Sequence, residues 1–298
     1  MMRLASVLLV AVMLTTSMLS GTFAKYVTTG EVSDSARVAK FGVILAAEGS
    51  LFDKTYLTTT NTPGGTTEDG ADGKALSVEA NENVVAPGTK SDANGLKLSI
   101  SGTPEVDVKI QFTFDDTNLK DVFLAKGTYQ DMTSAHYNET FTFDDADYYP
   151  IVYTVKGKLI SAANEATLKN ENSGLTVNTT DNTMSGNLEA IAKAFANLNG
   201  TDGYFVDANT NLATEIGDLT FTWEWKYTDS TNGTITANDK KDTLLGDLAA
   251  MKNNTSFADN LPDWVKNTVK NALAGYTEGT QYGLDVALKL TVTVTQVD

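Results

Sequence analysis

The chain has 298 residues, of which 38 are acidic and 22 are basic, so its net charge is -16, and it contains no cysteine. Such an acidic surface repels nucleic acid and anionic lipid, which argues against proteins that bind either of them through charge. Without disulfides, the hydrophobic core or assembly with other subunits must supply the stability of the fold.

Residues 1–24 have the pattern of a cleavable signal peptide. A basic start at Arg3 precedes an apolar run over residues 4–14, and small residues lead up to Ala24. The apolar run is shorter than the roughly 20 residues of a membrane-spanning helix. We therefore predict cleavage between Ala24 and Lys25, with an uncleaved anchor or a buried helix as the alternative. An exported chain without cysteine is typical of the exterior of a Gram-positive-type bacterium, so we expect a secreted or cell-surface protein.

Residues 25–38 combine β-prone side chains with small polar ones. The β-prone residues are Tyr26, Val27, Thr28, Thr29, Val32 and Val38. The segment is either an edge strand of its own domain or an extended segment that adds a strand to a neighbouring copy. Strand addition gains main-chain hydrogen bonds and needs only shallow pockets for alternate side chains.

Strict alternation of apolar and polar residues is the main fold signal in residues 39–298, which we predict to form one domain. Three long stretches alternate in this way: residues 106–114, 219–227 and 284–294. Shorter strands are expected at residues 41–45, 96–100 and 149–155. Strands with one apolar face are typical of stacked antiparallel sheets, so the sequence predicts an all-β sandwich.

A few short helical insertions are expected within this β framework. Four segments have apolar residues at helical spacing: 118–124, 188–198, 244–251 and 265–273. The segment at 188–198 has a candidate N-cap at Ser185 and a stop at Gly200. We expect these helices to cover an open end or face of the sandwich. Loops rich in Gly, Asn, Thr and Asp are expected at residues 61–74, 164–174 and 229–241.

The sequence shows no catalytic set. His136 is the only histidine, and a zinc site needs three or four ligands, so we interpret His136 as a loop residue. The acidic segments 68–73 and 144–147 could supply oxygen ligands to calcium, but neither has the spacing of the twelve-residue calcium loop. We predict no catalytic, metal-binding or cofactor-binding residues and no enzymatic activity; calcium remains the one cofactor left open.

Trp223 and Trp225 alternate with polar residues on one predicted strand. Large aromatic side chains in this pattern more often fill a core than form an exposed sugar-binding platform. We interpret them as core residues. A surface adhesin or carbohydrate-binding module that uses a loop or this strand remains the alternative function.

Residues 20–26, Ser-Gly-Thr-Phe-Ala-Lys-Tyr, and residues 35–42, Ser-Ala-Arg-Val-Ala-Lys-Phe-Gly, resemble the opening of the TasA/camelysin family. The leaders of this family are cut by a dedicated SipW-type signal peptidase. Further likeness lies in the Pro-Gly turn at 84–88, in Trp-Glu-Trp at 223–225 and in the ending at 293–298. The middle of the chain, about residues 128–214, has no counterpart in the family pattern.

The resemblance implies a jelly-roll-like β-sandwich that assembles into extracellular fibres of a biofilm matrix. In such fibres the N-terminal strand of one mature subunit completes the sheet of the next. Carried onto this chain, residues 25–38 would be the donor, and a groove beside the C-terminal strand would be the acceptor. The implied partners are other copies of the chain, an accessory matrix protein and the SipW-type signal peptidase, with no nucleic acid.

Camelysin itself is described as a metalloprotease. This chain has no His-Glu-x-x-His helix and only one histidine, so we do not carry that activity over. The predicted function is a non-catalytic fibre subunit, with the adhesin as the alternative and a camelysin-like secreted metalloprotease ranked last.

Overall fold

The computed structural model describes a large part of the predicted domain. The described residues are 39–52, 55–58, 75–77, 85–130, 140–143, 146–226, 238, 241–242, 244–246, 249, 282–283 and 285–297. The predicted signal peptide, the donor segment 25–38, His136 and the acidic segment 68–73 lie outside them, as does the helix expected at 265–273.

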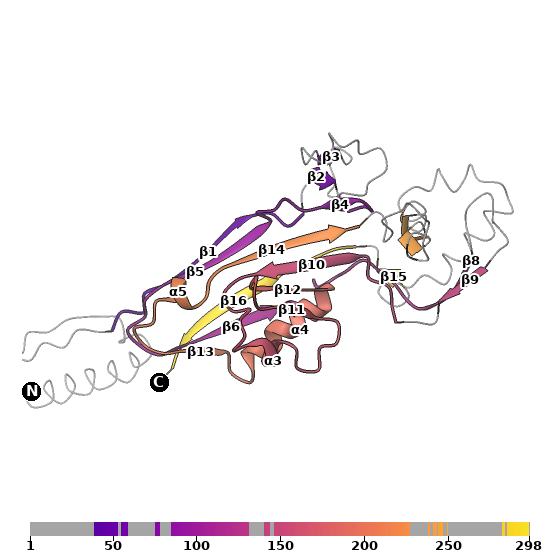
Figure 1. The fold of residues 1–298 in the computed structure, drawn as a ribbon. Helices are drawn as coiled ribbons and strands as arrows, with labels where there is room; N and C mark the ends of the chain where they lie inside the picture. The colour runs from indigo at the N-terminus through magenta and orange to yellow at the C-terminus, as the bar shows by residue number, and fades with distance from the viewer. Residues whose placement is uncertain are drawn as a thin grey trace, which may run out of the picture.

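Among the described residues, most strands belong to two antiparallel sheets (Figure 1). The larger sheet has nine strands: β1 (Val43–Gly49), β2 (Thr55–Thr58), β3 (Ala75–Ser77), β4 (Thr89–Lys90), β5 (Leu96–Gly102), β10 (Ile151–Lys156), β11 (Thr176–Asn178), β12 (Thr183–Gly186) and β14 (Gly217–Trp225). The smaller sheet has the order β13 (Tyr204–Val206), β6 (Val108–Phe114) and β16 (Leu290–Gln296).

The remaining described elements are short. Two strand pairs lie apart from the main sheets: β7 (Phe123–Leu124) with β15 (Tyr282–Gly283), and β8 (Gly127–Gln130) with β9 (Thr140–Phe143). The helices with defined bounds are α3 (Glu165–Leu168), α4 (Leu188–Asn199) and α5 (Leu212–Glu215). The predicted all-β class, with antiparallel sheets and a few short helices, is therefore confirmed.

Alternating side chains build the core as expected. On β6, the inward residues are buried while Gln111 and Thr113 between them are exposed. On β14, every second residue from Gly217 to Trp225 is buried. This strand is central, because it pairs with β10 along one edge and with β5 and β4 along the other. The apolar faces of β6 and β14 belong to one core cluster.

Helix α4 connects the two sheets. The ring of Phe195 lies 5.1 Å from that of Phe112 and 5.6 Å from that of Phe114, both on β6, and 6.1 Å from that of Phe221 on β14. Phe195 is fully buried, as are its helix neighbours Ile191 and Ala194. The predicted helix at 188–198 thus exists, and its apolar stripe packs into the core between the sheets.

Several expected boundaries are wrong for local reasons. The N-cap of α4 is Asn187, whose Oδ1 accepts from the Ala190 N–H at 2.8 Å, because Ser185 is already paired in β12. The segment 118–124 is not a helical turn, since it enters β-type pairing at Lys120 and in β7. The expected loop at 164–174 contains α3.

The terminal strands also differ from their expected bounds. β1 extends over Val43–Gly49 instead of 41–45, because its ladder with β5 spans that whole length. β16 begins at Leu290 rather than at 284, because Leu290 is opposite Phe114, the last residue of β6. Residues before Leu290 therefore have no strand partner on β6.

Asn199, at the end of α4, satisfies the backbone of β6. Its Oδ1 accepts from the Phe112 N–H at 2.9 Å and its Nδ2 donates to the Phe112 carbonyl at 2.6 Å. Beyond this point β13 continues the pairing, with Tyr204 opposite Ile110. The edge of β6 that faces away from β16 is thus closed by a side chain and a short strand.

We predict that Asn199→Ala lowers the free energy of unfolding by about 2 kcal/mol, because two buried backbone groups of Phe112 lose their partners. Urea denaturation measures the loss. Asn197→Ala is the matched control, since the half-buried Asn197 lies on the same helix and its Nδ2 donates to the Asn170 carbonyl, outside the sheets. Equal stabilities of the two variants would contradict this role of Asn199.

Candidate functional site

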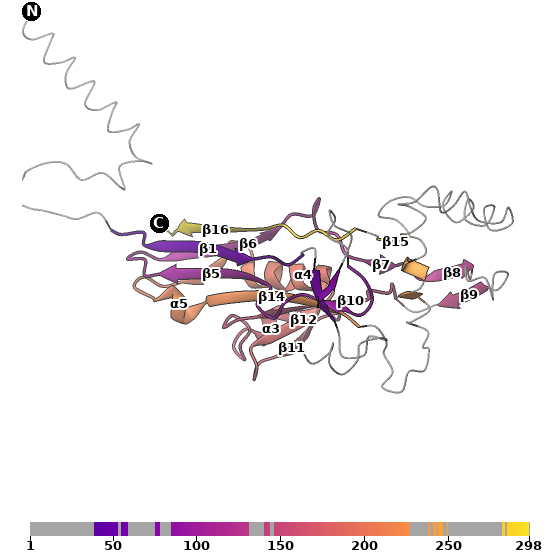
Figure 2. The same ribbon diagram turned by 90° about the horizontal axis from the view of Figure 1, so that it is seen from above.

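Two long strands have an edge to which none of the described strands is paired. Among the described strands, β1 pairs only with β5, and β16 pairs only with β6. Each has seven residues. Figure 2 shows β1 and β16 along the same border of the molecule, with β16 running toward the end at which β1 begins. The larger and smaller sheets therefore both end at this border.

A groove of about 480 Å³ lies between these edges. Side chains of β1, β5, β14 and β16 and of the residues just before β16 line it: Leu45, Ala46, Ala47, Leu96, Leu98, Phe221, Leu288, Lys289, Leu290 and Val292. Lys289 is the one charged residue in this lining. We call this feature the β1–β16 groove.

The border is less covered than the rest of the core. Ile44 and Leu45, which point to opposite faces of β1, are 62% and 42% exposed. The inward residues of β16, which include Val292 and Val294, are half-buried, whereas Trp223 on the central strand β14 is only 2% exposed. Burial of this apolar surface would be favourable by about 25 cal/mol per Å². The groove thus combines unpaired backbone with apolar surface.

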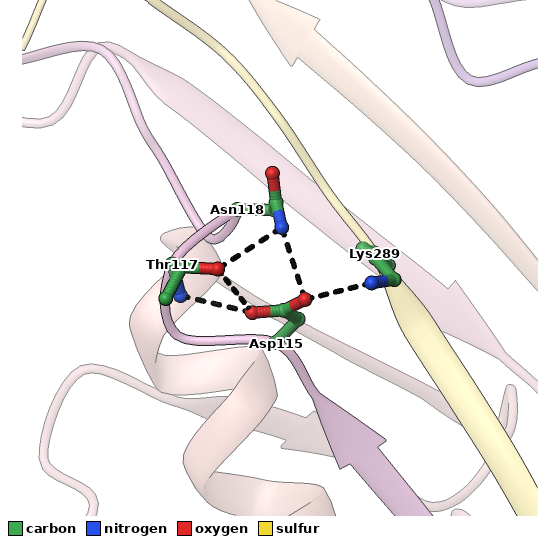
Figure 3. A network of polar contacts seen from close by, with 4 residues as sticks. All are labelled: Asp115, Thr117, Asn118 and Lys289. Carbon is green, nitrogen blue, oxygen red and sulfur yellow. Dashed lines mark hydrogen bonds and ion pairs between the residues drawn. The ribbon is translucent and has the colours of Figure 1, made fainter.

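The start of β16 is fixed to the end of β6 by the polar network shown in Figure 3. Lys289 Nζ lies 2.8 Å from Asp115 Oδ2, and the Asp115 N–H donates to the Lys289 carbonyl at 3.0 Å. Asp115 also accepts from the Thr117 hydroxyl at 2.6 Å and from Asn118 Nδ2 at 2.9 Å. The hydrogen bond from Lys289, and then those from Thr117 and Asn118, lower the pKa of Asp115. The network holds β16 at the rim of the groove.

The residues that lead into β1 lie at the end of the groove opposite to the Asp115–Lys289 pair. The Lys40 carbonyl accepts from the Glu105 N–H at 2.9 Å, and the Lys40 N–H donates to Glu105 Oε2 at 2.8 Å. Gly42 has φ +51°, and a Cβ there would lie 2.8 Å from the Thr103 carbonyl oxygen, so this turn favours glycine. Residues 39–42 thus continue the line of β1 alongside the residues that follow β5.

Trp223 and Trp225 are core residues, as interpreted from their alternation. They are 2% and 4% exposed, and Trp223 Nε1 donates to the Leu51 carbonyl at 2.7 Å. The alternative of an exposed sugar-binding platform on this strand is wrong, because both rings are buried.

The search for a metal site covers only the part of the chain that the structure describes. Within the described ranges, no three His, Cys, Asp or Glu side chains are grouped so that they could hold a metal ion. Of the acidic segment 144–147, Asp147 is described, and its Oδ1 accepts from the Lys126 N–H at 3.0 Å. None of the helices in the described part of the chain is long and apolar enough to cross a membrane.

Comparisons of the chain with protein-family models, with characterised proteins and with solved structures found no match. The β1–β16 groove is therefore interpreted from its own geometry. The alternation of the sequence located β5 and β14, but it could not show that β1 and the C-terminal strand border the same groove.

We predict that Lys289→Gln raises the pKa of Asp115 toward its ordinary value of 3.8, because the largest cause of its lowered pKa is removed. A depressed carboxyl pKa stabilises the fold at neutral pH, and this stabilisation is lost on acidification through the lowered pKa. Carbon-13 NMR titration of Asp115 measures the change. Lys109→Gln, which removes the ion pair with Asp202 instead, should leave the Asp115 titration unchanged. An unaltered Asp115 pKa in Lys289→Gln would refute the assignment.

Proposed function

We propose that this protein is a secreted, non-catalytic structural subunit that forms extracellular fibres of a biofilm matrix by strand donation between copies. The observation that carries the proposal is the β1–β16 groove, an apolar channel flanked by two free strand edges. The proposal includes a jelly-roll-like order of the sandwich, export by the signal peptide of residues 1–24, and donation of residues 25–38.

A strand placed in the groove would pair with the backbone groups along these strand edges and would cover the apolar side chains between them. Unpaired N–H and C=O groups along an edge strand are a template for another strand. An added strand would also place every second side chain over Leu98 and Phe221 in the groove. Seven residues of strand are about 23 Å long. The 14 residues from Lys25 to Val38 are long enough to follow the whole edge.

One face of the donor segment suits the groove. In an extended strand Tyr26, Thr28, Val32 and Val38 fall on the same face, because their positions differ by even numbers. Val27 and Thr29 fall on the other face. Tyr26 and Val38 are about 40 Å apart in an extended strand, which is longer than the edge, so we propose that the part of this face around Val32 enters the groove.

The entry to β1 favours donation to a neighbour. Residues 39–42 continue the line of β1, so the preceding segment would have to reverse direction to reach the groove of its own subunit. A segment from a copy repeated along the strand axis enters without reversal. It then runs parallel to β1 and antiparallel to β16, and extends the antiparallel sheet of β13, β6 and β16. We propose β16 as the acceptor edge, since antiparallel pairing is slightly more stable per residue.

We predict that deletion of residues 25–38 leaves a folded, soluble protein that does not polymerise. Negative-stain electron microscopy of the mature and truncated proteins measures fibre formation. A synthetic peptide of residues 25–38 should bind the truncated protein with one-to-one stoichiometry. Fibres of normal yield from the truncated protein would reject the donor model.

A substitution in the lining of the β1–β16 groove tests, in the mature chain, whether this groove accepts the donated strand. Leu98→Glu should abolish fibres, because a carboxylate cannot enter the apolar groove without a large desolvation cost. Ser99→Glu is the matched control, since Ser99 is the next residue of β5 and points to the other face of the sheet. Circular dichroism checks that both variants fold. Fibres from Leu98→Glu in the same amount as from Ser99→Glu would contradict the proposed acceptor.

The direction of the donated strand can be mapped by disulfides, because the chain has no cysteine of its own. In antiparallel pairing with β16, a cysteine at Thr28 should crosslink between subunits to one at Val294 in preference to one at Leu290. A cysteine at Ala36 should show the reverse preference. The opposite pattern would indicate a donated strand parallel to β16 and would reject the proposed antiparallel pairing. Non-reducing gel electrophoresis measures the crosslinks.

A further inference from the structure

A second hollow of the surface lies at strands β10, β11 and β12, on the side of β14 away from β5 and β1 (Figure 1). Its volume is about 450 Å³, within the roughly 300–1,000 Å³ of small-molecule sites. These strands and the residues just before β10 line it, with side chains that include Tyr148, Tyr149, Val152, Thr176, Ser185 and Asn187. We call this feature the tyrosine hollow.

One side of the tyrosine hollow is the outer face of three paired strands. Thr176 of β11 lies opposite Ser185 of β12, and Ser185 lies opposite Thr154 of β10. The residue before Ser185, Met184, is buried in the core, so Ser185 is on the outer face. Val152, two residues before Thr154, is on this face as well and is 42% exposed. This side therefore combines hydroxyl groups with an exposed apolar side chain.

Two tyrosine rings line the hollow beside this face, and their neighbours hold both rings in place. The ring of Tyr149 is stacked on that of Phe123, with 5.5 Å between their centres. The Tyr148 hydroxyl donates to Asp242 Oδ1 at 2.9 Å, and Lys241 Nζ lies 5.0 Å from the centre of the Tyr148 ring. Rings held in this way need little ordering when a ligand binds, which favours affinity.

Several polar groups of the lining are not used by the fold. Within the part of the chain that the structure describes, the hydroxyl groups of Tyr149, Thr176 and Ser185 make no hydrogen bond to the protein. Asn187 Oδ1 accepts from the Ala190 N–H, and among the described residues its Nδ2 has no acceptor. A hydroxyl group both donates and accepts, and an amide nitrogen donates. This set of groups suits a ligand that carries many hydroxyl groups.

The charges of the lining balance one another. It contains one acid, Asp147, and one base, Lys241, which is 8% exposed. A carboxylate or phosphate ligand therefore meets no excess of positive charge in the hollow, and the net charge of -16 of the chain repels it. The lining favours a neutral ligand.

We propose that the tyrosine hollow binds a neutral sugar chain, as in a hexose polysaccharide. Sugar rings have apolar C–H faces that pack on aromatic and aliphatic side chains, and their hydroxyl groups bond to short polar side chains. The site is distinct from Trp223 and Trp225, which are buried in the core. The inference goes beyond fibre formation and does not rest on it, because the hollow and the β1–β16 groove lie on opposite sides of β14.

An array of neutral hexose oligosaccharides, with uronic-acid oligosaccharides as the charged comparison, tests the proposal on the mature protein. Neutral members should bind in preference to charged ones. The Thr176→Val/Ser185→Ala double variant should bind the best neutral member about tenfold more weakly by isothermal titration calorimetry, because two hydroxyl groups are removed.

The matched control is Thr183→Val combined with Thr220→Val. These threonines are half-buried on β12 and β14 and lie outside the lining of the hollow, so their loss should leave affinity unchanged. Circular dichroism checks that both double variants fold. Absence of binding to every neutral member, preference for the uronic acids, or equal affinities of the two double variants would overturn the proposal.

A second measurement locates the site on the wild type and does not depend on a variant. When the best neutral oligosaccharide is added, NMR amide signals of Val152, Thr176 and Ser185 should shift, whereas that of Leu45 in the β1–β16 groove should not. Shifts at Leu45 without shifts at the three residues of the hollow would reject this site.

Discussion

The rest of the account depends on one constraint: β1 and β16 each have an edge to which no other described strand is paired, and apolar surface lies between these edges. Unpaired backbone groups on a strand edge and half-exposed apolar side chains are both unfavourable in water unless something covers them. Here both occur at one border, where Leu45 and Leu98 line the same groove. A strand inserted between β1 and β16 would pair with the backbone groups and cover the apolar side chains. For this reason the groove fits the proposed assembly better than it fits the binding of a small ligand.

The rest of the described fold anchors the strands of this border. On the far side of β6, Asn199 and β13 close the edge, and Phe195 fills the space between the sheets. At the groove itself, the Asp115–Lys289 pair fixes the start of β16. The paired backbone of Lys40 and Glu105 fixes the entry to β1. Walls that these contacts already hold in place would need less ordering when a strand binds, and such preorganisation favours affinity.

The sequence predicted which segments form strands better than it predicted which strands pair with one another. Alternation alone identified β6 and β14 and the burial of Trp223, because a period of two records which face meets the core. It could not identify partners far apart in the chain, such as Gly217 opposite Ile100, and hence could not locate the groove. Two local predictions were wrong. A helical turn was expected at 118–124, but Lys120 pairs with Ala287. Ser185 was expected to cap α4, but Asn187 is the N-cap. The donor role of residues 25–38 stays a prediction.

Hydrogen exchange of the mature protein, as monomer and as fibre, tests the central claim most directly. The account predicts that amides on the free edge of β16 exchange quickly in the monomer and become protected on assembly. Amides of β10, which is already paired on both edges, should change little. Full protection of β16 in the monomer, or no gain of protection on assembly, would show that this border has no strand to accept.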